Sequence, residues 1–247
     1  MCRHIALVAR APVALDRPLF GEGQSLERQT YAPAHQAVGR VNADGWGVGW
    51  WDRTIRPEPA RYRTVTPMWA DLRFREIAPL IRTSALVAAA RNATTGAPVE
   101  ESGNAPFTDG PWLFSFNGYV EGFRHGIGTE LRRAVSDRRD RGILGSSDAE
   151  VLFALLLDHL DAGAPPADAV ATLVGEVSTR AGGRFNLLLS DGATVVASRY
   201  RNELFTRSDP GCGTWVASEP LDDEAWDEVP DRTLVVANVD EIRRLPL

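Results

Sequence analysis

The sequence contains no lysine, so its 27 basic residues are all arginine, and 33 acidic residues outnumber them. The net charge of −6 does not suit a nucleic-acid-binding surface. With only two cysteines, Cys2 and Cys212, the chain has neither a disulfide framework nor a thiolate metal site. No apolar run reaches the roughly 18 residues that a membrane span requires. We therefore expect a cytoplasmic protein that uses no metal or cofactor and has no nucleic-acid or membrane partner.

The length and composition favour one large globular domain. The chain has 247 residues, of which 44% are hydrophobic, and no Ser/Gly-rich or Pro-rich linker divides it. Because a small residue follows the initiator methionine, we expect Met1 to be removed and the domain to comprise residues 2–247.

Apolar patterning predicts many strands and a few helices. Strands are expected at residues 5–10, 86–90, 112–116, 185–189, 194–200, 214–217 and 233–236, and helices at 68–81, 148–160 and from about 165 to 182. Asp191-Gly192 is typical of a hairpin turn between two of these strands. The helix at 148–160 is apolar nearly all round, which predicts that it lies between layers. Together these elements indicate a layered α+β fold.

The first residues, Met1-Cys2-Arg3-His4, carry the strongest chemical signal. Once Met1 is removed, Cys2 holds a thiol and a free α-amino group. An α-amino group has a pKa of roughly 8, so it can accept the thiol proton near neutral pH. The resulting thiolate is a strong nucleophile. Cys2 is therefore a candidate that supplies its own base, although a cysteine at this position can also be incidental.

Two further motifs could belong to a functional site or could have a purely structural role. Arg91 precedes the loop Asn92-Ala93-Thr94 at the end of a strand, where a guanidinium can grip a carboxylate. The pair Asn117-Gly118 follows an apolar strand, and its amide and N–H groups could form an oxyanion hole. Asn-Gly is also the commonest hairpin turn, so the pattern alone leaves both interpretations open.

Asp148 and Trp46 carry similar ambiguities. Asp148 opens the apolar helix, where it could cap the helix or receive an ammonium group. Residues 42–51 are rich in glycine and tryptophan, and Trp46 could either wall a pocket or pack in the core of a hairpin.

As a set, these motifs resemble the class II glutamine amidotransferases, a family of N-terminal nucleophile hydrolases. The resemblance rests on Cys2, the Arg91 loop, Asn117-Gly118 and the helix start at Asp148, which occur in that order. It implies a four-layer αββα sandwich, with Cys2 as the nucleophile and Asn117 and Gly118 as the oxyanion hole. The substrate would be a small γ-glutamyl compound.

The same resemblance implies roles for the binding residues. Arg91, helped by Thr94, would bind the α-carboxylate of the glutamyl group, and Asp148 would pair with its α-ammonium. A cationic group on the amine side could lie against the aromatic face of Trp46, Trp50, Trp69 or Trp112.

Residues 1–4, 42–50, 105–115 and 217–222 look most like the γ-glutamyl-hercynylcysteine sulfoxide hydrolases of ergothioneine biosynthesis. Those enzymes release glutamate and hercynylcysteine sulfoxide, so we expect an amidohydrolase acting through a Cys2 thioester. Two alternatives remain open. One is a glutaminase subunit that supplies ammonia from L-glutamine to a separate synthase, and the other is a binding module of the same fold without turnover.

Overall fold

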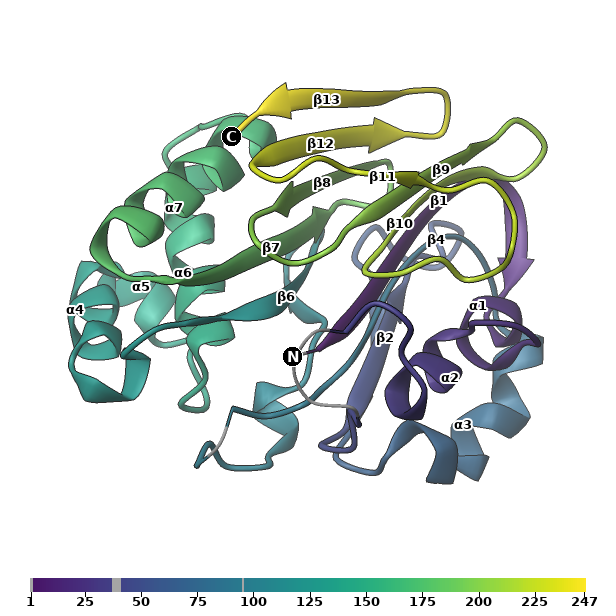
Figure 1. Ribbon diagram of the computed structural model, residues 1–247, viewed down its shortest axis with the longest axis horizontal. Coiled ribbons are helices and arrows are strands. Elements are labelled where there is room, and N and C mark those ends of the chain that lie inside the picture. Colours follow the sequence, from purple (N-terminus) through teal and green to yellow (C-terminus); the bar gives the residue numbers. More distant parts are fainter. Residues whose placement is uncertain (1, 37–40, 95) are drawn as a thin grey trace.

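The computed structural model describes residues 2–36, 41–94 and 96–247 of the chain. Two antiparallel sheets lie face to face at the centre, and helices cover the outer face of each (Figure 1). The predicted four-layer αββα sandwich is confirmed. In the part of the chain that is described, no helix combines the length and apolar character that a membrane crossing demands.

The first sheet has the strand order β11-β9-β10-β1-β4-β2-β3, and the second has the order β13-β12-β8-β7-β6-β5. The strands of the first sheet are β1 (Arg3–Ala14), β2 (Trp46–Trp50), β3 (Ala60–Thr64), β4 (Arg82–Ala90), β9 (Phe205–Asp209), β10 (Gly213–Ala217) and β11 (Asp227–Glu228). Those of the second are β5 (Phe107–Asp109), β6 (Trp112–Val120), β7 (Gly183–Ser190), β8 (Thr194–Arg199), β12 (Thr233–Asn238) and β13 (Ile242–Pro246).

Each sheet has its own helical layer. The first is covered by α1 (Asp16–Phe20), α2 (Leu26–Tyr31), α3 (Leu72–Ile77) and the 3-10 turns η1 (Met68–Ala70) and η2 (Ala78–Leu80). The second is covered by α4 (Ile127–Ala134), α5 (Asp137–Asp140), α6 (Asp148–Asp161) and α7 (Pro166–Arg180). The turns η3 (Glu101–Gly103) and η4 (Phe123–His125) lie in connecting segments.

Alternation along β1 divides the core between these layers. Ile5 and Leu7 face the helices of the first sheet, whereas Ala6 and Val8 face the second sheet. Because side chains point to opposite faces at a period of two, Cys2 and His4 belong to the face between the sheets. The thiol is thereby directed toward the inter-sheet space at the start of β1.

All seven predicted strands are present, and two of the three predicted helices are continuous. The helix expected at 68–81 is instead broken into η1, α3 and η2. Asp71 accepts a hydrogen bond from the Phe74 N–H at 3.2 Å and so caps a new helix inside the predicted one. A proline at residue 79 then falls in η2.

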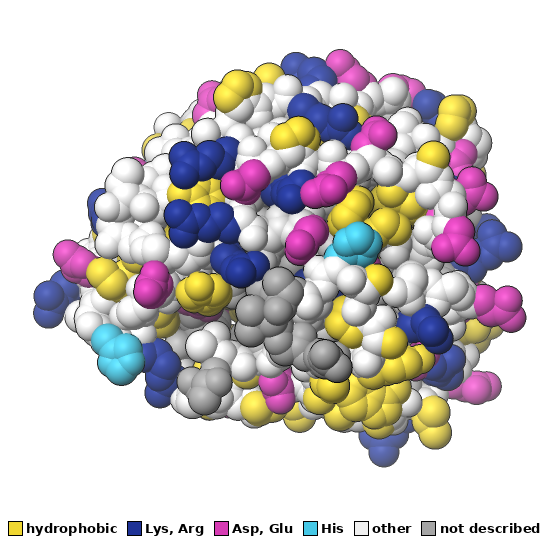
Figure 2. Space-filling view, in the orientation of Figure 1, with side chains coloured by type: hydrophobic (Ala, Val, Ile, Leu, Met, Phe, Trp, Pro, Cys, Tyr) yellow, Lys and Arg dark blue, Asp and Glu magenta, His cyan; other side chains and the backbone are white. Residues whose placement is uncertain are grey.

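The surface mixes charge signs. Arginine and acidic side chains are interspersed over much of the face in Figure 2. Exposed apolar side chains gather over the helices of the first sheet in the same view, and Tyr31, Trp69 and Leu72 are among the exposed residues of that layer.

Candidate functional site

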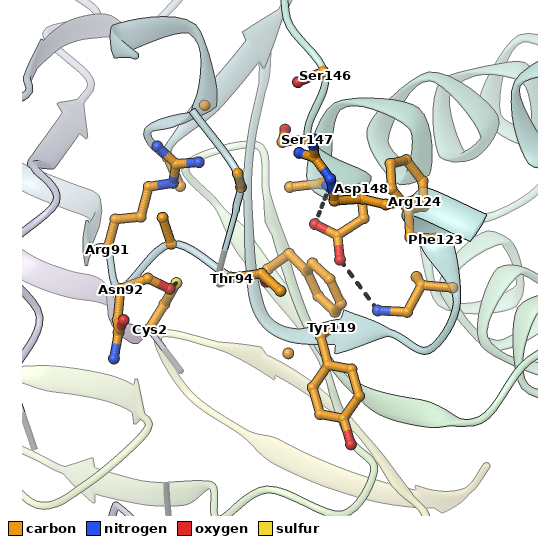
Figure 3. A pocket seen from close by; sticks show the side chains of 18 of the residues that line it. Cys2, Arg91, Asn92, Thr94, Tyr119, Phe123, Arg124, Ser146, Ser147 and Asp148 are labelled. Carbon is orange, nitrogen blue, oxygen red and sulfur yellow. Dashed lines mark hydrogen bonds between the residues drawn. The ribbon is translucent and has the colours of Figure 1, made fainter. Parts of the chain in front are cut away.

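A cavity of about 280 Å³ lies at the end of the inter-sheet space where β1 begins. It is lined by Cys2, the end of β4 with residues 91–94, the end of β6 with residues 118–120, the segment 121–125, and residues 146–149 at the start of α6 (Figure 3). The Cys2 side chain is half-buried, and its Sγ lies 3.9 Å from the carbonyl oxygen of Asn92. The candidate nucleophile therefore lies on the wall of this cavity.

A buried ion pair fixes the backbone at Cys2. The Arg3 Nε donates to the Cys2 carbonyl at 2.9 Å, and Arg3 Nη1 lies 3.2 Å from a carboxylate oxygen of Glu219. Glu219 also accepts hydrogen bonds from the backbone N–H groups of Ala34 and His35. Burial lowers the pKa of Arg3, and the charge of Glu219 opposes that shift. Sequence analysis missed this pair because its members lie 216 residues apart.

The Asn117-Gly118 pair lies inside β6 and forms no turn. The strand continues to Val120, and Asn117 and Gly118 pair with Asn186 and Phe185 of β7. A Cβ at Gly118 would stand 1.9 Å from the Arg184 carbonyl oxygen, so only glycine fits there. The hairpin interpretation of this motif is therefore wrong.

Asn117 carries a buried side-chain amide without a hydrogen-bond partner among the described residues. It is completely buried, and its backbone carbonyl accepts a hydrogen bond from Asn202 at 2.8 Å. Neither atom of its side-chain amide has a partner among the described residues, although buried amides are normally paired. Asn117 shares the inter-sheet face of β6 with Leu113. Gly118 lines the cavity itself, whereas Asn117 is not among the lining residues.

Arg91 is 9% exposed, and one nitrogen of its guanidinium makes no hydrogen bond to the described residues. Its Nη2 donates to the Pro98 carbonyl at 3.2 Å, while Nη1 has no partner within the described ranges. Its guanidinium packs against Gly103, where a Cβ would stand 2.9 Å away. Thr94 also lines the cavity and is exposed.

The glycine- and tryptophan-rich motif holds the Arg91 loop in place. The Asp44 carboxylate accepts the Ala93 N–H at 2.8 Å. Backbone hydrogen bonds join Asp44 N–H to the Arg91 carbonyl at 3.1 Å and Arg91 N–H to the Gly45 carbonyl at 2.8 Å. The motif thus supports the cavity indirectly, because Asp44 and the backbone of Gly45 hold residues 91–93 in place.

Trp46 does not line the cavity, so the role predicted for it is wrong. It is completely buried under the first helical layer, and its Nε1–H donates to Asp71 at 3.2 Å. Gly47 and Gly49 occupy the opposite face of β2, and a Cβ at Gly49 would stand 2.5 Å from the Leu113 side chain. A Cβ at Gly47 would stand 2.6 Å from the Ala105 carbonyl oxygen, so this face of β2 has little room for side chains.

The other three tryptophans of the prediction also lie outside the cavity. Trp50 packs in the first helical layer, Trp69 belongs to η1, and Trp112 packs against the core of the second. The aromatic residues that do line the cavity are Phe107, Phe116, Tyr119 and Phe123.

Asp148 faces the cavity because another residue caps its helix. Ser147 is the N-cap, and it forms a reciprocal capping box with Glu150. The Asp148 carboxylate accepts the N–H groups of Val120 at 3.1 Å and Ala149 at 2.9 Å, which are the dashed contacts in Figure 3.

The environment of Asp148 favours a compensating cation. The residue is partly accessible through the cavity, yet protein surrounds its carboxylate, and this burial raises its pKa. Its backbone hydrogen bonds and the positive charge of Arg91 oppose that shift. A cavity holding Arg91 and Asp148 can therefore bind a molecule with one carboxylate and one ammonium group.

Sequence analysis missed the segment that closes the cavity beyond β6. Residues 121–125 contribute Glu121, Phe123, Arg124 and His125 to the lining. The segment has no apolar periodicity and no recognised motif, so only its place in the fold identifies it. Within the described residues, no cluster of three or more His, Cys, Asp or Glu side chains could hold a metal ion.

This fold, with a cysteine at the start of a central strand and paired charges in the adjacent cavity, is that of an amidotransferase-type domain. The class II glutamine amidotransferases match residues 24–214, and the chain belongs to this family. It is similar to the γ-glutamyl-hercynylcysteine sulfoxide hydrolase of Mycobacterium tuberculosis (strain CDC 1551 / Oshkosh). The two are 38% identical over 238 residues, which cover 95% of this chain and 92% of that protein.

Solved structures agree with this assignment. A glutamine aminotransferase class-II domain protein from Silicibacter pomeroyi has a TM-score of 0.70 at 27% identity, covering 100% of this chain and 99% of that chain. Glutamine phosphoribosylpyrophosphate amidotransferase from B. subtilis has a TM-score of 0.69 at 13% identity, covering 100% of this chain and 49% of that chain. The second likeness concerns the fold alone. The family predicted from the sequence is confirmed.

Proposed function

We propose that this chain is an amidohydrolase that cleaves the γ-glutamyl amide of γ-glutamyl-hercynylcysteine sulfoxide and releases glutamate and hercynylcysteine sulfoxide. The observation that carries the proposal is that Arg91 and Asp148 line the same cavity as Cys2. A free glutamyl α-carboxylate and α-ammonium need one cation and one anion at fixed positions. Similarity to the mycobacterial hydrolase over 95% of the chain supports this substrate.

The proposed reaction begins with acylation of Cys2. The α-amino group of Cys2 accepts the thiol proton, and the thiolate attacks the γ-carbonyl carbon. The Asn117 amide and the Gly118 N–H donate hydrogen bonds to the tetrahedral oxyanion, while Arg91 and Thr94 hold the α-carboxylate and Asp148 holds the α-ammonium. The C–N bond then breaks, and the proton on the α-amino group moves to the departing amine.

Water completes the turnover. The freed α-amino group of Cys2 takes a proton from a water molecule, whose oxygen attacks the thioester carbonyl. The C–S bond breaks, glutamate leaves, and the thiol regains its proton. This chemistry needs no metal or cofactor, but it requires that Met1 be absent. Removal of Met1 is a prediction that lies outside the described residues.

The leaving amine would occupy the part of the cavity lined by Tyr119 and residues 121–125. Tyr119 and Phe123 offer aromatic faces to a trimethylammonium group, and Glu121 offers a negative charge. Arg124 offers a guanidinium to the carboxylate on the amine side. These residues replace the tryptophans expected from the sequence.

The proposal includes the cellular setting. Residues 2–247 would act as one catalytic domain on a small molecule, with no nucleic-acid or membrane partner. The cytoplasm suits it, because a reducing compartment keeps the Cys2 thiol free.

The test is a mass-spectrometric assay of glutamate release from γ-glutamyl-hercynylcysteine sulfoxide and from L-glutamine, with the Met-free N-terminus verified. We expect kcat/KM at least about 100-fold higher for the sulfoxide, equivalent to roughly 2.7 kcal/mol of differential transition-state binding. Equal efficiencies, or a preference for L-glutamine, would favour a glutaminase subunit with a synthase partner. No release from either compound would favour a binding module.

A further inference from the structure

A polar pair interrupts the apolar space between the two sheets. His4 lies two residues after Cys2 in β1, and Ser115 lies two residues before Asn117 in β6. Both are completely buried, and His4 Nδ1 lies 3.2 Å from Ser115 Oγ. This hydrogen bond joins the strand that begins beside the nucleophile to the strand that carries the candidate oxyanion hole.

Burying His4 and Ser115 between the sheets carries a desolvation cost. The next layer of the inter-sheet space is apolar and includes Ala6, Val8 and Leu113. Burial, together with the charge of Arg3, lowers the pKa of His4 to about 3, so its imidazole is neutral at physiological pH. Its Nε2 has no partner among the residues that the structure describes. An apolar pair of similar volume would avoid this desolvation cost, so stability alone gives little reason for a histidine here.

A hydrogen bond supplies something that apolar packing does not, namely a fixed direction and distance. The strands β1 and β6 belong to different sheets and share no ladder of backbone hydrogen bonds. Side chains alone therefore set the offset of one strand against the other. Any change in that offset moves Cys2 relative to Asn117.

We propose that His4 and Ser115 are positioning residues, which hold the Cys2 thiol in register with the Asn117 amide by joining β1 to β6. This role rests on the proposed function, since it concerns the geometry of the same acylation step. A displacement of about 1 Å in a reacting group can cost on the order of 100-fold in rate. Arg91 follows β4, the ladder partner of β1, and Asp148 is held by the Val120 N–H of β6, so the same displacement also reaches the binding groups. Charge–charge contacts weaken gradually with distance, whereas a reacting atom needs a close approach, so kcat should fall more than KM rises.

The experiment separates kcat from KM in matched variants. We expect His4→Ala and Ser115→Ala to lower kcat roughly 10- to 100-fold, with a much smaller change in KM. Asparagine places a polar group near the position of Nδ1, whereas glutamine places one near Nε2. His4→Asn should therefore recover much of kcat and His4→Gln should not. Ser115→Thr, which keeps the hydroxyl, should also recover activity.

Two controls distinguish positioning from loss of stability. Ser198 is another completely buried serine, whose hydroxyl bonds to Phe185 and Leu187 within the second sheet. Ser198→Ala should lower Tm and leave kcat unchanged. The double variant of His4→Ala and Ser115→Ala should be about as impaired as either single variant, because both remove one interaction.

The outcomes separate the two proposals. A wild-type protein that releases no glutamate overturns the proposed function and, with it, this role. An active wild type with unchanged kcat in His4→Ala and Ser115→Ala overturns the positioning role alone. Additive losses in the double variant, or equal recovery by His4→Asn and His4→Gln, would overturn it as well.

Discussion

The two ends of the cavity are built from different kinds of structure. The proposed glutamyl end places Arg91 at the end of a central strand and Asp148 at the start of a buried helix. The proposed amine end uses Tyr119 of β6 and residues 121–125, a short connecting segment that contains η4 and in which Glu121, Arg124 and His125 are exposed. A rigid end suits a group common to all γ-glutamyl substrates, whereas an exposed segment can change without disturbing the core.

Removing the nucleophile should abolish hydrolysis of every substrate, whichever end of the cavity binds it. We expect Cys2→Ala to lower kcat by at least about 10⁴-fold, because Cys2 is the only thiol among the described residues that line the cavity. Cys212→Ala is the matched control, since Cys212 lies outside the cavity, and it should retain activity. Circular dichroism should show a folded Cys2→Ala protein. Near wild-type turnover from that protein would end the thioester mechanism.

The glutamyl end should matter equally for every substrate. We expect Arg91→Ala and Asp148→Asn each to lower kcat/KM roughly 30- to 1,000-fold, because each leaves one charged end of the substrate without a partner. The loss should be the same for γ-glutamyl-hercynylcysteine sulfoxide and for L-glutamine. Arg82→Ala, at the opposite end of β4, is the control and should have little effect. Wild-type kcat/KM in both site variants would place the glutamyl pocket elsewhere.

The sequence predicts features with a strong local pattern, and it misses contacts between residues that are far apart in the chain. The strand and helix that frame the glutamyl end have strong local patterns, so β4, α6 and the residues beside them could be predicted. The Arg3–Glu219 and His4–Ser115 pairs could not, because they join residues 216 and 111 positions apart.

Trp46 shows a further limit of sequence patterns. In β2 the tryptophans and glycines of Trp46-Gly47-Val48-Gly49-Trp50 occupy opposite faces of the strand. The sequence pattern allowed Trp46 either to wall a pocket or to pack in the core of a hairpin. It does not reveal which face meets the other sheet. That depends on how closely Leu113 approaches from β6, which is a tertiary property.

The amine end should matter for one substrate only. We expect Glu121→Gln and Arg124→Gln to lower kcat/KM for the sulfoxide by about 3- to 30-fold, as loss of one partly exposed charged contact would. Hydrolysis of L-glutamine should not change, since its leaving group is ammonia. Arg133→Gln, on the exposed face of α4, is the control. Equal losses for both substrates would remove the distinction between the two ends.

The smallest expected effect is on stability and concerns Asp148. Burial raises the folded-state pKa of this carboxyl above its unfolded value, so folding favours the protonated form. Asp148 therefore weakens the fold at neutral pH, which lies above its unfolded pKa, and ceases to do so as pH falls below both pKa values. Asp148→Asn removes the charge, so this less active variant should have a Tm higher than wild type by on the order of 2 °C at pH 7.

That Tm difference should shrink on acidification, as wild-type Asp148 becomes protonated and resembles the amide. Thermal unfolding of both proteins from pH 7 to pH 4 is the measurement, with Asp168→Asn, at an exposed position of α7, as the control that should show no such trend. A lower Tm for Asp148→Asn at pH 7 would mean that the Val120 and Ala149 contacts outweigh the cost of burial. In that case the glutamyl end would be stabilised by its own charge, and a bound ammonium group would not be needed to offset it.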